Sequence, residues 1–241
     1  MTVCRRHFLQ GSLSAGALVF AAPSGLIAGE APSAGVPARS SIADMRRLLL
    51  LRSAGDDAFA LPAMQVARRY GAYPVASLAL SEQLAGDPAA LRTILSQHRG
   101  VRLIGLMDDC THSLVEETLR DLGGSIVCRG RHRGLLNEAT ASRHSFTTTA
   151  ATHGIGSALA SAMTANGTAF LVQEHSHCEV ALVPRDGLPL PTAPWPAVLG
   201  TSYGLMVTGL WTAGPVIAEQ RRGAVADNPR SDAFVSLVAE I

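Results

Sequence analysis

Residues 108–112, Asp-Asp-Cys-Thr-His, bring together three side-chain types that bind metals or transfer protons. Carboxylate, thiol and imidazole groups are transition-metal ligands, and a carboxylate beside an imidazole can share a proton. The segment follows an apolar run, so a strand of a parallel sheet would present it at its carboxyl end, where open α/β sheets bind ligands. A structural interpretation is also open, in which Asp108 or Asp109 caps the next helix and Cys110 packs beneath it.

Residues 174–178, Glu-His-Ser-His-Cys, form a second polar cluster. In an extended chain His175 and His177 point to one face, and a His-x-His pair recurs in metal sites. Zinc or copper would need ligands from elsewhere, since the chain has no Cys-x-x-Cys or His-Glu-x-x-His motif. The predicted metal site consists of Asp108, Cys110, His112, His153, His175 and His177. The alternative is a polar hairpin turn with exposed histidines.

A third candidate is the segment 152–157, Thr-His-Gly-Ile-Gly-Ser, which follows a predicted strand and opens a predicted helix. Backbone amides at a helix start favour phosphate or carboxylate. Gly154 and Gly156 are therefore predicted to bind a cofactor anion, and Arg129 and Arg131 add positive charge. The third glycine of a dinucleotide-binding fingerprint is absent. A tight turn and a row of solvated arginines is the alternative.

Strand and helix patterns alternate from residue 46 to residue 133 and would position these clusters. Apolar runs at 46–53, 73–80, 101–107 and 125–129 predict strands. Helical spacing at 58–70, an Asp87-Pro88 helix start and a capping box at 113–116 predict the helices between them. The alternation predicts a mostly parallel sheet with helices on both faces, a three-layer α/β arrangement that resembles a Rossmann fold.

The second half of the chain is less regular. Strand patterns at 145–150, 169–173 and 179–183 accompany a helix of small residues at 155–165 and a proline-rich connector at 184–196. The apolar stretch 197–213 predicts a helix in which Gly200 and Gly204 permit close helix approach. Its seventeen residues include five polar ones, which favours a buried or dimer-forming helix over a membrane span.

Composition narrows the function classes. The net charge of +1 gives no indication of nucleic-acid or anionic-membrane binding. The chain has no lysine, which excludes Schiff-base chemistry and a Walker lysine. The motif Gly-x-Ser-x-Gly of α/β-hydrolases is also absent.

The first residues resemble a bacterial twin-arginine (Tat) export signal. Arg5-Arg6-His7-Phe8-Leu9 matches the Arg-Arg-x-Phe-Leu core of that family, and a weakly hydrophobic Gly/Ala/Ser-rich stretch follows it. Cys4 and Gln10 depart from the family pattern at the two flanking positions. The resemblance covers residues 1–35 and implies export to the periplasm by the Tat translocase in a folded state. The length of the remaining chain predicts a single α/β domain over residues 36–241. Cys110, Cys128 and Cys178 follow the signal, and their pairing stays open.

Two functional hypotheses follow. One is a binding or accessory component of a redox or cofactor-dependent system, exported with a redox-enzyme partner or as a homodimer. The other is a metal-dependent periplasmic enzyme with a His/Asp/Cys site at the sheet edge. No catalytic motif decides between them, so the accessory or binding role is the main prediction.

Overall fold

The computed structural model describes residues 47–53, 56–134, 141–176, 193–211, 218–223, 225 and 233–241. These lie in the unit Ser40–Ile241, whereas the unit Met1–Arg39, which contains the Tat-like segment, lies outside the described residues. The described strands are β1 (Arg47–Arg52), β2 (Tyr73–Ala79), β3 (Arg102–Asp108), β4 (Ser125–Arg133), β5 (Ser142–Thr148), β6 (Phe170–Ser176), β7 (Glu219–Arg222) and β8 (Ala233–Glu240). The described helices are α1 (Asp57–Arg69), α2 (Glu82–Ala85), α3 (Pro88–Ser96), α4 (Asp109–Asp121), α5 (Ile155–Ala165) and α6 (Trp195–Val207).

The strands form one mixed sheet in the order β2-β1-β3-β8-β4-β5-β6-β7. Only the pairs β1–β2, β1–β3 and β5–β6 are parallel, and the other four pairs are antiparallel. The predicted α/β class with helices on both faces is confirmed. The prediction of a mostly parallel sheet is wrong, and the Rossmann-like order is not found in the described strands.

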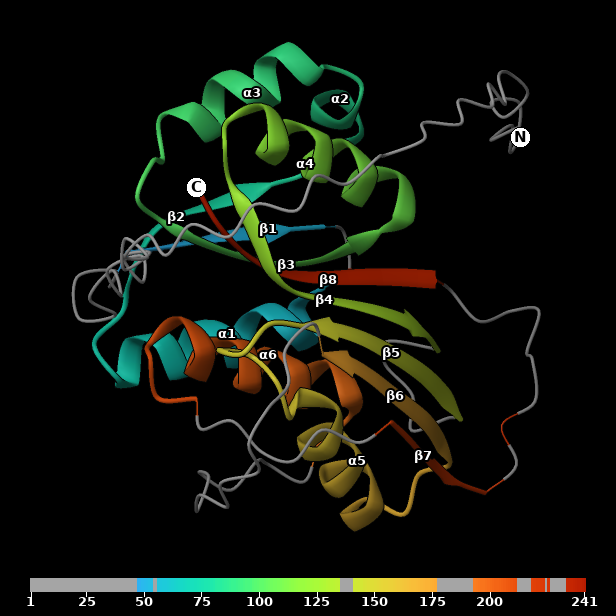
Figure 1. Cartoon of the computed structure of the whole chain (residues 1–241). Helices are drawn as coiled ribbons and strands as arrows, with labels where there is room; N and C mark the ends of the chain where they lie inside the picture. Colours follow the sequence, from blue (N-terminus) through green and yellow to red (C-terminus); the bar gives the residue numbers. More distant parts are fainter. Residues whose placement is uncertain are drawn as a thin grey trace, which may run out of the picture. The chain divides into compact units, whose positions relative to one another are not determined.

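The C-terminal strand causes this difference. β8 inserts between β3 and β4 and is antiparallel to both (Figure 1). β4 therefore still runs in the same direction as β3, as the β-α-β pattern predicts, but the two strands are not hydrogen-bonded neighbours. The chain reverses between β4 and β5, so that β5 and β6 run antiparallel to β4, whereas the edge strand β7 runs in the same direction as β4.

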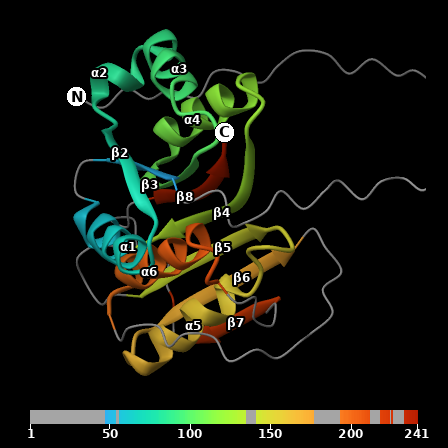
Figure 2. The same ribbon diagram turned by 90° about the vertical axis from the view of Figure 1, so that its left-hand side faces the viewer.

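Two hydrophobic cores lie on opposite faces of the sheet. The helices α1, α5 and α6 cover one face, and α2, α3 and α4 cover the other (Figures 1 and 2). β1 contributes to both cores, because Leu48 and Leu50 face α1 whereas Leu49 and Leu51 face α3 and α4, and all four are fully buried. The core beneath α2–α4 contains residues of β1, β3 and β8 but, in the described part of the chain, none of β5, β6 or β7.

Local sequence signals place most helices correctly. Asp87 caps α3 by accepting a hydrogen bond from the Ala90 amide at 3.0 Å, as its position before Pro88 predicts. α4 differs from its prediction, because it begins at Asp109 and not at the capping box of Ser113. Asp108 supplies the cap one turn earlier, and the Ser113 hydroxyl bonds back to the Asp109 carbonyl.

α6 is a buried helix that packs directly on α1. Tyr203 of α6 meets Phe59 of α1 edge to face at a centroid distance of 5.8 Å. Gly200 and Gly204 face the α1 backbone, where an added Cβ at Gly200 would lie 2.1 Å from the Phe59 carbonyl oxygen. This agrees with the prediction of a close-packed helix. In the described residues, no helix is long and apolar enough to span a membrane.

Candidate functional site

Asp108 acts as a helix cap. Its carboxylate accepts hydrogen bonds from the Thr111 amide at 2.9 Å and from the Thr111 hydroxyl. Partial burial raises the pKa of Asp108, but these hydrogen bonds outweigh that effect and the net pKa is lowered. The structural interpretation of this carboxylate is therefore confirmed.

His112 lies one turn further along α4 and is 3% exposed. Its Nδ1 atom is 3.7 Å from the Glu116 carboxylate, and its buried Nε2 atom has no hydrogen-bond partner among the described residues. Burial lowers the pKa of His112, and the nearby Arg129 guanidinium adds to this against the opposing effect of Glu116. Cys110, two residues away, is exposed.

The described metal candidates are dispersed. His153 is buried after β5 with its Nδ1 atom 2.6 Å from the Ala150 carbonyl oxygen, whereas His175 is exposed on β6. Within the part of the chain that the structure describes, no three His, Cys, Asp or Glu residues form a group able to hold a metal ion. His177 and Cys178 lie outside the described residues, so their participation in a metal site stays a prediction.

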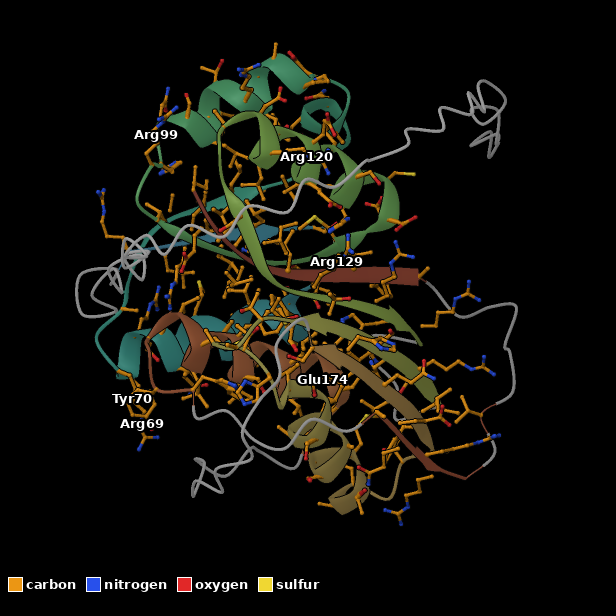
Figure 3. The ribbon with its side chains drawn as sticks, in the orientation of Figure 1. Arg69, Tyr70, Arg99, Arg120, Arg129 and Glu174 are labelled. Carbon is orange, nitrogen blue, oxygen red and sulfur yellow. The ribbon has the colours of Figure 1, made fainter. Side chains whose placement is uncertain are left out.

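The glycine loop before α5 holds an anion that belongs to the chain itself. Glu174 accepts hydrogen bonds from the Gly154 amide at 2.7 Å, the Gly156 amide at 3.0 Å and the Thr148 hydroxyl at 3.1 Å. Burial raises the pKa of Glu174, while the two amides oppose that rise. Figure 3 labels Glu174 on the α5 side of the sheet. The amides predicted to bind a cofactor anion are thus already bonded to a carboxylate.

Gly154 and Gly156 are glycines for different reasons. Gly154 has a φ of +86°, which favours glycine, and a Cβ at Gly156 would lie 2.9 Å from a Glu174 carboxylate oxygen. Both positions therefore serve the contact with Glu174. The prediction that these amides bind a cofactor anion did not anticipate that the Glu174 carboxylate of the chain itself accepts their hydrogen bonds.

The arginines of β4 lie on the opposite face of the sheet from Glu174. Arg129 approaches both carboxylate oxygens of Glu116 on α4, at 3.3 and 3.4 Å. Arg131 and Arg133 follow at two-residue spacing and line a cavity of about 330 Å³ together with Arg143 of β5. In the described part of the chain, the side chains of Arg131 and Arg133 form no ion pair. Of the two arginines predicted to support anion binding, Arg131 lines this cavity, whereas Arg129 pairs with Glu116 of α4.

Sheet register assembles the cavity from the four strands β4, β5, β6 and β8. Arg133 lies opposite Arg143, which in turn lies opposite Leu171 of β6. The next row on the same face is Arg131, Ser145 and Gln173. Asp109 lines the cavity from the first turn of α4, and Ala233 and Val235 line it from β8. Sequence reasoning missed Arg143, Ser145, Leu171 and Gln173, because only the pairing of β4 with β5 and β6 brings them to the arginines.

A buried chain of hydrogen bonds runs beneath the other face of β4 and β5. The Ser142 hydroxyl is 2.8 Å from His144 Nε2, and the two Nδ1 atoms of His144 and His132 are 2.9 Å apart. Ser236 then links His132 Nε2, at 2.7 Å, to the Tyr203 hydroxyl, also at 2.7 Å. This chain of hydrogen bonds can run in either direction with both imidazoles neutral, because each neutral ring has one donor nitrogen and one acceptor nitrogen.

Ser142, His144 and His132 contact one another in the order of a nucleophile, a base and an orienting group in a catalytic triad. However, Ser142 is only 1% exposed, and a neutral imidazole stands where a triad has a carboxylate. Burial lowers the pKa of His132 well below its ordinary value and that of His144 to about 3. Trp195 stacks on His132 at a centroid distance of 5.0 Å, which completes an aromatic enclosure. The chain is therefore a satisfied structural network.

Comparison with known proteins gives no match, either to a protein-family model, to a curated protein or to a solved structure.

Proposed function

We propose that this protein is an exported binding protein that holds a small anionic ligand in the cavity between β4, β5, β6, the start of β8 and the first turn of α4. One observation carries the proposal: three arginines line this cavity, and its only acidic lining residue in the described chain is Asp109. The volume of about 330 Å³ falls at the lower end of the range of small-molecule pockets. The proposal is a binding function and includes no reaction.

The arginine side chains have the chemistry that anion binding needs. A guanidinium donates two parallel hydrogen bonds to a carboxylate or phosphate, and its planar shape fixes the ligand's orientation. Arg143 is anchored by a hydrogen bond of 2.9 Å from Nη2 to the Val225 carbonyl. The Ser145 hydroxyl and the Gln173 amide add neutral groups, and the Gln173 amide is itself held by Glu219 at 2.9 Å. The cavity thus combines positively charged side chains with polar groups that hydrogen bonds hold in place.

The Tat-like signal at Arg5-Arg6 supports an exported, periplasmic site of action. A protein that crosses the membrane folded can carry a ligand or partner loaded before export, which agrees with an accessory role in a redox or cofactor-dependent system. No group of donors among the described residues favours the metal-dependent alternative.

The test is a calorimetric titration of the purified protein with inorganic phosphate, sulfate, succinate and benzoate. We expect at least one of these anions to bind with 1:1 stoichiometry and a Kd below about 1 mM, more weakly as the salt concentration rises. Each lost charge-assisted hydrogen bond costs about 1.5–3 kcal/mol. The double substitution Arg131→Gln/Arg133→Gln should therefore weaken that binding at least tenfold.

The matched control is Arg92→Gln/Arg120→Gln, which removes two exposed arginines from α3 and α4 whose partners are exposed or half-buried acids. This control should bind the anion with unchanged affinity. The proposal fails if none of the four anions binds at 10 mM, or if the cavity variant binds as tightly as the wild type.

A further inference from the structure

The net charge of +1 is unevenly distributed over the chain. The parallel strands β1, β2 and β3 all begin at the same end of the sheet, called here the amino end. Four exposed arginines lie there, at the start of β1, at the end of α1 and just before β3: Arg47, Arg68, Arg69 and Arg99. Figure 3 shows Arg69 and Arg99 on the same side of the molecule.

These arginines are not neutralised by acidic side chains of the described residues. Among those residues, none of the four arginines forms an ion pair. Glu240 and Asp121 also lie at the amino end, where β8 and α4 end, but they are already paired with Arg102 at 3.0 Å and with Arg92 at 3.2 Å. A terminal carboxylate at Ile241 would offset one of the four charges. The amino end therefore carries a net positive charge.

Two exposed apolar side chains accompany the arginines. Tyr70 and Leu210 are two of the three large hydrophobic side chains that the described chain exposes. They follow the C-terminal ends of α1 and α6, which pack together and run in the same direction. Arg102, at the start of β3, donates a hydrogen bond of 2.9 Å to the Met206 carbonyl, which holds the end of α6 at the amino end of the sheet. The Arg69 guanidinium lies over the Tyr70 ring at 5.6 Å.

This combination of side chains fits the surface of an anionic membrane. Arginines attract lipid phosphates, tyrosine rings lie at the level of the head groups, and leucine side chains enter the boundary with the acyl chains. The course of the chain favours a membrane over an acidic protein as the partner. The apolar stretch of the predicted signal ends at Ile27, and the chain enters the described domain at Arg47. The attachment point of a signal held in a bilayer thus lies within the positive surface.

We infer that the amino end of the sheet is a surface that binds anionic phospholipid bilayers. The guanidinium groups contact the lipid phosphates, and Tyr70 and Leu210 enter the head-group layer. The cavity lies at the opposite end of β4, where Arg131 and Arg133 are found, so a domain bound in this way leaves the cavity open. This surface is separate from the cavity and adds a membrane association to the proposed function.

The experiment is sedimentation of the purified full chain with vesicles of phosphatidylglycerol and phosphatidylcholine in equal amounts, or of phosphatidylcholine alone. We expect binding to the anionic vesicles to be stronger than to the neutral ones, and this difference should disappear at high salt. Each basic residue near an anionic surface strengthens binding about fivefold. Arg68→Gln/Arg99→Gln should therefore weaken binding to the anionic vesicles at least tenfold. Tyr70→Ser/Leu210→Ser should weaken it several-fold, because both side chains would leave the head-group layer.

The matched control is Arg131→Gln/Arg133→Gln, which removes two exposed arginines at the opposite end of the sheet. This control should bind the anionic vesicles as the wild type does. The predicted signal is present in every variant, so its own contribution to vesicle binding cancels in the comparison. Arg68→Gln/Arg99→Gln should still bind the anion of the cavity, which separates this inference from the proposed function.

Equal binding of the wild type to anionic and neutral vesicles would overturn the inference, since head-group charge would then not be recognised. Binding of Arg68→Gln/Arg99→Gln to the anionic vesicles as tightly as the wild type would overturn it too. If that variant loses binding to poly-glutamate in solution but not to the vesicles, the amino end fits an acidic protein and the lipid assignment is wrong.

Discussion

Replacement of Gly200 by alanine is expected to destabilise the protein by about 3 kcal/mol or more, at the upper end of the cost of overpacking a core. The new methyl group would lie 2.1 Å from the Phe59 carbonyl oxygen, so α1 and α6 could not keep their separation. Backbone atoms on both sides leave no flexible side chain to move aside. Urea unfolding followed by circular dichroism measures the loss.

Two comparisons make this result specific. Helix propensity alone predicts the opposite sign, because alanine in a helix interior is favoured over glycine by about 1 kcal/mol. Gly204→Ala should cost less than Gly200→Ala, since its nearest backbone contact is 2.9 Å, to the Ala63 oxygen. Thr201→Ala, at a half-buried position of the same helix, should be within about 0.5 kcal/mol of the wild type. A stable Gly200→Ala variant would disprove the close α1–α6 contact.

Acid is expected to destabilise the fold through the paired imidazoles of His132 and His144. Both pKa values lie below the ordinary value of 6.5, because burial disfavours the charged form, and His144 is lowered to about 3. Above pH 6.5 both rings are neutral in the folded and unfolded chains, so their contribution to stability is complete. Below pH 6.5 only the unfolded chain takes up protons, and stability falls by about 1.4 kcal/mol per pH unit for each ring. From pH 7 to pH 4.5 the pair removes roughly 5 kcal/mol.

Two carboxyl groups act in the opposite sense. Burial raises the pKa of Asp56 to about 6 and also raises that of Glu174. The folded chain therefore binds their protons more readily than the unfolded chain, and their contribution to stability grows as the pH falls through these pKa values. The net loss of the wild type is consequently smaller than the contribution of the imidazoles alone.

The histidine contribution is isolated by comparing the wild type with His132→Asn/His144→Asn. The difference in unfolding free energy between the two proteins should shrink by roughly 5 kcal/mol between pH 7 and pH 4.5. The wild type alone offers a second measurement, since the imidazole ¹⁵N shifts of His132 and His144 should remain those of neutral rings at pH 5. Protonation of either ring with a midpoint at or above pH 6 would contradict the buried-pair account.

The sequence predicted local structure well where the residues that determine a helix or strand lie next to one another in the chain. The apolar run of β1, the Asp87 cap of α3 and the small-residue helix α5 depend on neighbours in the chain, and each is present at or within a few residues of its predicted range. The capping box at Ser113 failed because an earlier carboxylate, Asp108, competes for the same helix start. Two acceptable caps one turn apart cannot be ranked without the position of the strand before them.

The sheet and the site depend on contacts between distant segments. The pairing of β8 with β3 and β4 joins residues a hundred or more positions apart, and no local pattern encodes it. The same holds for Glu174, which reaches the amides of Gly154 and Gly156 from the next strand, and for Arg143, which joins Arg131 and Arg133 only through strand register. Residue types alone indicated groups that can hold an anion, but tertiary structure decides which of them lie together and which partner each of them meets.

The anion-binding cavity is tested most directly by nuclear magnetic resonance of protein labelled with ¹⁵N-arginine. Every basic side chain other than histidine is an arginine, so the Nε–H signals report on all of these cations at once. On titration with inorganic phosphate, we expect the signals of Arg131, Arg133 and Arg143 to shift together along one saturating curve, while those of Arg92 and Arg120 remain in place. No shift at the three cavity arginines, or equal shifts at exposed arginines across the surface, would contradict the proposed binding site.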